Sequence, residues 1–129
     1  MDNDTALKEV ICKSLKSKLG VASIIEFSYD TSKKKDCKID VFAQIGGDLF
    51  LFECKTNSKE SKAKKQLCFH KSAFLKLRNY FLHVYSLSYG NIKLFFVSEK
   101  NNQITNLETS ECTSFNPSFL DDPGDFLLR

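Results

Sequence analysis

Apolar residues in the first half of the chain change from a helical to a strand-like spacing after Gly20. Before this glycine, their spacing predicts a helix from about residue 5 to residue 19. The apolar stripe of the helix is expected to be Leu7, Val10, Ile11, Leu15 and Leu19. Residues 23–29 are rich in β-branched and aromatic side chains and predict a first strand.

Two apolar stretches separated by a pair of glycines predict a β-hairpin. Strands are expected at residues 38–45 and 48–55, with Gly46 and Gly47 as the two-residue turn. Both faces of the hairpin are apolar, which is typical of strands that are covered by helices on both sides. One face is predicted to hold Phe42, Leu49 and Leu51, and the other Ile39, Val41, Phe50 and Phe52.

The second half of the chain predicts the remaining helical layer and another strand. A long helix is expected from residue 58 to about residue 86, with a break near Asn79. Residues 92–98 predict a fourth strand, which would run parallel to residues 48–55 through a right-handed crossover. Residues 104–107 predict a short edge strand. The inward stripe of the long helix is expected to be Leu67, Phe74, Leu77, Phe81 and Val84.

Length and composition favour one ordinary globular domain over residues 1–129. Its core is expected over about residues 5–98, followed by an irregular C-terminal segment, 99–129, that packs through Phe115, Phe119 and Phe126. The five cysteines include no CxxC pair, which favours free thiols and disfavours a zinc site. No signal peptide or membrane-length apolar run is evident, so an intracellular protein, cytoplasmic or nuclear, without a membrane partner is expected.

The hairpin brings charged residues into the apolar pattern. Counting outward from the glycine turn places Asp40 directly opposite Glu53, with Lys55 on the same face as Glu53. Two carboxylates in direct opposition repel each other unless a cation lies between them. Carboxylate oxygens are the ligands that Mg²⁺ and Mn²⁺ prefer, so the hairpin predicts a metal site.

The order helix, three strands, helix, strand, with Ile39-Asp40 and Glu53-Cys54-Lys55 on neighbouring strands, resembles the PD-(D/E)xK nuclease superfamily over about residues 5–98. Ile39 stands where the family motif has proline. The resemblance implies an α/β fold (an α+β mixed sheet) with a restriction-endonuclease-like αβββαβ core and helices on both faces. It implies a metal-dependent endonuclease that hydrolyses phosphodiester bonds in DNA or RNA. The expected ligands of Mg²⁺ or Mn²⁺ are Asp40, Glu53 and the backbone carbonyl of Cys54, while Lys55 orients the attacking water.

Further site residues are expected by the same resemblance. Many members have an acidic residue in the first helix that reaches the metal; Glu9 is the candidate here, and Glu26 on the first strand is its rival. Gln66 corresponds to a glutamine that several subgroups place over the active site. His70, four residues later, lies on the same helical face.

Basic residues cluster in the middle of the chain, although the net charge of +3 alone does not indicate a nucleic-acid binder. The expected phosphate contacts, beside that of His70, come from Lys33, Lys34, Lys35, Lys59, Lys62, Lys64 and Lys65. Two alternatives stay open. One is a catalytically weak or inactive nuclease fold that binds nucleic acid or protein. The other is a nuclease domain of a larger sensor- or polymerase-linked protein that needs a partner or a homodimer.

Overall fold

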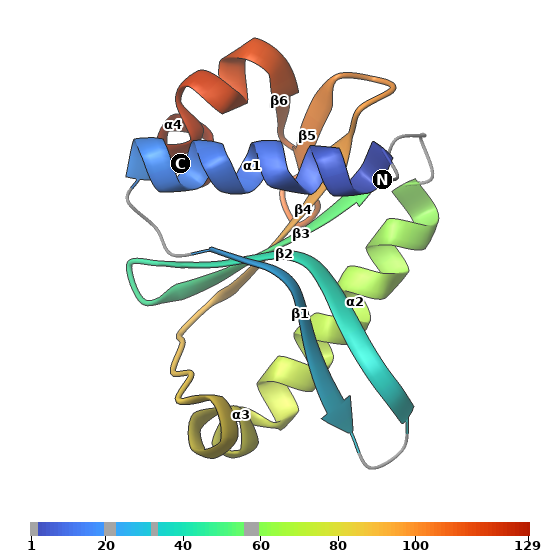
Figure 1. Cartoon of the computed structure of the whole chain (residues 1–129), viewed down its shortest axis with the longest axis vertical. Helices are drawn as coiled ribbons and strands as arrows, with labels where there is room; N and C mark the ends of the chain where they lie inside the picture. Colours follow the sequence, from blue (N-terminus) through green and yellow to red (C-terminus); the bar gives the residue numbers. More distant parts are fainter. Residues whose placement is uncertain (1–2, 20–22, 32–33, 56–59) are drawn as a thin grey trace.

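The computed structural model describes residues 3–19, 23–31, 34–55 and 60–129 (Figure 1). Side chains of residues 3–5, 23–31 and 34–38 lie outside this description. The described strands form one six-stranded sheet in the order β1-β2-β3-β4-β5-β6. The strands are β1 (Ser23–Thr31), β2 (Lys34–Ile45), β3 (Asp48–Lys55), β4 (Ile92–Ser98), β5 (Gln103–Asn106) and β6 (Cys112–Ser114). The helical elements are α1 (Asn3–Leu19), α2 (Glu60–Lys76), α3 (Arg78–Tyr85), the irregular turn η1 (Phe115–Phe119) and α4 (Pro123–Leu127).

The β2–β3 hairpin forms as its sequence predicted. Gly46 and Gly47 have φ of 58° and 83°, a left-handed pair that a two-residue turn of this kind requires and that glycine adopts without strain. Ile45 pairs with Asp48 across the turn. β3 pairs in parallel with β4, which confirms the predicted direction of the fourth strand. All other neighbouring pairs in the sheet are antiparallel, so the sheet is mixed.

The sheet separates two hydrophobic cores, and helices cover both of its faces. One core lies under α1, η1 and α4, where Leu7, Ile11 and Leu15 of α1 pack against strand residues such as Phe52. The other lies under α2 and α3 and includes Phe74. Figure 1 shows α1 and α4 on one side of the central strands and α2 with α3 on the other. The mixed α+β class with two helical layers is therefore confirmed.

Two residues of the predicted helical stripes are exposed. Val10 is 44% exposed, because the buried stripe of α1 runs along Leu7, Ile11 and Leu15 and turns Val10 toward solvent. Val84 is 57% exposed. The predicted long helix divides at Leu77 into α2 and α3. The helical spacing that predicted a buried Val84 assumed one continuous helix, so it no longer holds in α3.

The face assignment of Ile39 was wrong. Ile39 packs with Phe42 and Leu49 in the core under α2 and α3, whereas Val41 belongs to the core under α1. The pairing of β2 with β3 ends at Val41, and the rest of β2 pairs only with β1. Beyond this point β2 curves away from β3 (Figure 1), so strict alternation along β2 no longer predicts which layer a side chain enters.

The C-terminal segment is more regular than its sequence suggested. β5 lies inside the sheet and β6 forms the edge, so the predicted edge position of residues 104–107 was wrong. Phe115, Phe119 and Phe126 are buried as predicted. Within the described parts of the chain, no helix combines the length and apolar character needed to cross a membrane.

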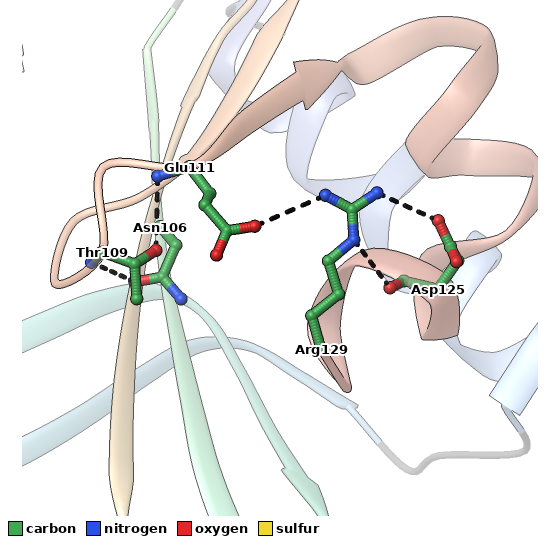
Figure 2. A network of polar contacts seen from close by, with 5 residues as sticks. All are labelled: Asn106, Thr109, Glu111, Asp125 and Arg129. Atoms are coloured by element: carbon green, nitrogen blue, oxygen red, sulfur yellow. Dashed lines mark hydrogen bonds and ion pairs between the residues drawn. The ribbon is translucent and has the colours of Figure 1, made fainter.

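A polar network joins the last helix to the sheet edge (Figure 2). The Arg129 guanidinium lies 3.1 Å from Oδ2 of Asp125 and 3.6 Å from Oε2 of Glu111. Backbone N–H groups of Thr109 and Glu111 donate to the side chains of Asn106 and Thr109, which shapes the turn between β5 and β6. These contacts connect α4 to the β5–β6 hairpin.

Candidate metal-binding carboxyl site

The candidate site forms where the pairing between β2 and β3 ends. The ladder of paired residues stops at Val41 and Phe52, and Asp40 is the next residue of β2. Oδ2 of Asp40 accepts a hydrogen bond from the backbone N–H of Cys54 at 2.9 Å. A side-chain hydrogen bond thus continues the contact between the strands and holds the Asp40 carboxyl against β3.

Glu53 lies beside Asp40, although the paired register of β2 and β3 ends one residue before the predicted Asp40–Glu53 pair. Its side chain is only 5% exposed. Burial is the largest cause that raises the pKa of Glu53 from 4.5 to about 8. The charge of Asp40 and a hydrogen bond between the two carboxyls raise it further, whereas Lys55 lowers it. Glu53 is therefore largely protonated at pH 7 and donates a hydrogen bond to the Asp40 carboxylate.

Each of the two carboxyls also contacts a lysine. Nζ of Lys55 lies 3.4 Å from Oε1 of Glu53, and the two side chains leave the same face of β3. Nζ of Lys8, from α1, lies 3.4 Å from Oδ1 of Asp40. Residues from one helix and two strands thus form a compact group in which lysines and carboxyls alternate, which we call the carboxyl–lysine quartet (Lys8, Asp40, Glu53 and Lys55).

The carboxyl oxygens of Asp40 and Glu53 suit a hard divalent cation. Mg²⁺ and Mn²⁺ are commonly held by one or two carboxylates, with water and substrate oxygens completing an octahedron. Asp40 and Glu53 supply two such carboxyls within hydrogen-bonding distance of each other. Among the described residues, no third Asp, Glu, His or Cys side chain joins them in a group that holds a metal. The set therefore fits a cation that keeps several waters better than one in an all-protein cage.

Cys54 contributes its backbone rather than its thiol. The side chain is fully buried in the core under α1, on the opposite face from Glu53. Burial is the largest cause that raises the pKa of this thiol well above its ordinary value, followed by the charges of Asp40 and Glu53. A buried thiol with a raised pKa is a poor nucleophile, so the side chain of Cys54 is a packing residue.

The structure does not bring Glu9 to the carboxyl pair. Glu9 is exposed and lines a shallow surface hollow with Cys12, Lys13, Lys16 and Ser17. Its position follows from the stripe of α1, because Glu9 is turned away from the side that Leu7 and Ile11 bury. The side chain of its rival, Glu26, lies outside the described part of the chain.

Gln66 and His70 have different surroundings although both belong to α2. His70 is only 4% exposed and aligns with the buried residues Ala63, Leu67 and Phe74. It stands edge-on to the ring of Phe69, 5.8 Å between ring centroids. The surface position that the expected nucleic-acid contact of His70 requires is not found, since the imidazole is buried. Gln66 is exposed on α2.

The second histidine and the described lysines of the basic cluster lie at the surface. His83 is exposed on α3. Lys62, Lys64 and Lys65 are exposed on α2, within the helix that follows Lys55 in the chain. Lys33 and Lys59 lie outside the described residues, as do the side chains of Lys34 and Lys35. The part of the basic surface that the structure describes is thus the first half of α2.

Lys8 is the site residue that sequence reasoning missed. It precedes Cys12 by one helical turn, and both are buried on a flank of the stripe formed by Leu7, Ile11 and Leu15. The sequence signal that could have identified it is a lysine at a helical position beside the apolar stripe. Only the packing of α1 on the sheet shows that its charge meets Asp40.

Comparisons with known proteins find only distant similarity in structure. No family model and no curated protein matches the chain. Its fold is similar to a solved structure described as "Crystal Structure of Protein of Unknown Function AF1548", with 17% sequence identity and a TM-score of 0.44. The match covers 74% of this chain and 48% of that one, so the chain spans about half the length of this neighbour.

Proposed function

We propose that the protein is a metal-dependent nuclease with a restriction-endonuclease-like core. The observation that supports this most directly is the buried contact between Asp40 and Glu53 beside Lys55. Burying two carboxyls against each other is costly, and proteins rarely do so unless a cation or a reaction uses them. The element order α1, β1, β2, β3, α2, β4 agrees with the proposed core, to which α3 is an addition.

The chemistry follows from the types of group that meet at the site. Asp40 and Glu53 would hold Mg²⁺ or Mn²⁺, which supplies Lewis-acid stabilisation of charge on a phosphodiester. Lys55 lies close enough to Glu53 to orient a water and to balance negative charge on the phosphate. Exposed Lys62 and Lys65 on α2 supply positive charge for the nucleic-acid backbone.

An inactive nucleic-acid-binding module is a second candidate, and one observation favours it. Lys8 and Lys55 already place positive charges against the two carboxyls, so the carboxyls have counter-cations without any metal. Such a module would bind nucleic acid in a salt-dependent way and would form no products with any metal.

Cleavage assays separate the two candidates. Labelled single- and double-stranded DNA and RNA are incubated with Mn²⁺, Mg²⁺ or EDTA and with wild type, Glu53→Gln or Lys55→Ala. A nuclease loses at least about a hundredfold in rate in both variants, since each removes a group at the reacting phosphate. Glu60→Gln is the matched control, because Glu60 is an exposed acid on α2. Cleavage that persists in Glu53→Gln, or that resists EDTA, would sink the metal-dependent assignment.

A further inference from the structure

Lys8 places a positive charge inside the site that we propose to bind a metal. Its Nζ lies 3.4 Å from Oδ1 of Asp40, and only 11% of its side chain is exposed. Lys8 is flanked on α1 by the buried residues Leu7 and Cys12, which pack into the core under this helix. The same packing that anchors α1 therefore directs the lysine toward Asp40.

The contacts of Asp40 leave a metal in direct competition with Lys8. Oδ2 of Asp40 accepts the hydrogen bond of the Cys54 backbone, so Oδ1 is the oxygen that faces Lys8. With Lys55 at Glu53, two positive charges balance two carboxylates even when both are ionised. A divalent cation at this place would meet two ammonium groups in a buried environment, where repulsion is less screened than in water.

We propose that Lys8 is a built-in counter-cation that competes with Mg²⁺ or Mn²⁺ for Oδ1 of Asp40. This inference rests on the metal site of the proposed function and adds a form of regulation to it. In the free protein, Lys8 neutralises Asp40 and keeps divalent-metal affinity low. Metal binding requires the ammonium group to move away from this oxygen.

The test is a titration of the whole chain with Mn²⁺, in which electron paramagnetic resonance measures the unbound metal. Lys8→Met removes the charge and keeps a long helix-forming side chain, and it should bind Mn²⁺ roughly five- to a hundredfold more tightly than wild type. Lys8→Arg retains the charge and should bind like wild type. Lys13→Met removes a charge from an exposed position of the same helix and should also bind like wild type.

The outcomes distinguish the Lys8 proposal from the metal site itself. Equal affinity in wild type and Lys8→Met, with binding abolished by Asp40→Asn, would overturn the competition and leave the metal site in place. If neither wild type nor Lys8→Met binds Mn²⁺, the competition and the metal site are both overturned. A gain in Lys13→Met as large as that in Lys8→Met would reduce the effect to net charge. If thermal unfolding shows that Lys8→Met does not fold, Lys8→Gln takes its place. Lys8→Gln also removes the charge but keeps a hydrogen-bond donor for Asp40, and the same outcomes apply to it.

Discussion

Two groups of ion pairs in this protein use the same chemistry in opposite surroundings. In the carboxyl–lysine quartet, Glu53 is almost fully buried, and the side chains of Lys8, Asp40 and Lys55 are at most 21% exposed. The Arg129 network joins α4 to the β5–β6 hairpin with side chains that are about half exposed or more. Exposed pairs cost little to form and contribute little, whereas buried charges require compensation from every neighbour. The burial of four titratable groups together is the observation on which our proposed function rests, whereas the exposed network needs only a structural explanation.

The largest expected effect is the pH dependence that Glu53 imposes on the metal-free protein. Its pKa is raised from 4.5 to about 8, so its contribution to folding stability is fully present below pH 4.5 and is lost as pH rises through 8. In EDTA, the free energy of unfolding of wild type relative to Glu53→Gln should fall by on the order of a few kcal/mol over this window. Urea unfolding at a series of pH values measures it.

Glu60→Gln is the control for this comparison, because it removes an exposed carboxyl from α2. Its unfolding free energy should follow that of wild type at every pH. Parallel pH curves for wild type and Glu53→Gln would contradict the burial and the carboxyl contact that we assign to Glu53.

A smaller effect is expected from the hydrogen bond that holds Asp40 against β3. Asp40→Ala leaves the buried N–H of Cys54 without this acceptor, whereas Asp40→Asn retains an oxygen in its place. Both variants remove the charge, so their difference reports the loss of polar side-chain contacts, of which the bond to Cys54 is one. Asp40→Ala should be less stable than Asp40→Asn by about 1–3 kcal/mol in urea unfolding. Equal stabilities would mean that the site does not depend on this contact.

The smallest effect is expected at the exposed network of Figure 2. Arg129→Ala removes the contacts to Glu111 and Asp125 and the position of the guanidinium over the ring of Phe126. The loss in unfolding free energy should stay below about 1 kcal/mol and shrink at high salt, because exposed charges are screened. A salt-independent loss of several times this size would remove the contrast between the two regions.

The parts of the fold that could be predicted from sequence depend on neighbours along the chain. The glycine turn determines which residues of β2 and β3 face each other, so the proximity of Asp40 and Glu53 followed from counting. Lys55 followed from alternation along one strand. The assignment of Ile39 failed at the point where β2 leaves β3, since alternation assumes a strand that does not bend away.

Site residues on elements far from the hairpin in sequence could not be placed by counting along the chain. Glu9 was the natural acid in the first helix, yet the helix turns it outward and presents Lys8 to Asp40. The choice between these neighbours depends on the rotation of α1 about its axis, which the packing of Leu7, Ile11 and Leu15 on the sheet decides. His70 was likewise expected at the surface, and the docking of α2 buried it.

By itself, the sequence determined the helix and strand pattern, the hairpin register and the meeting of two carboxyls, because short-range sterics and side-chain periodicity act within a few residues. The tertiary structure decided the burial that raises the pKa of Glu53 and the arrival of Lys8. Both depend on how whole elements pack, and desolvation and long-range ion pairs arise only when distant segments exclude water together.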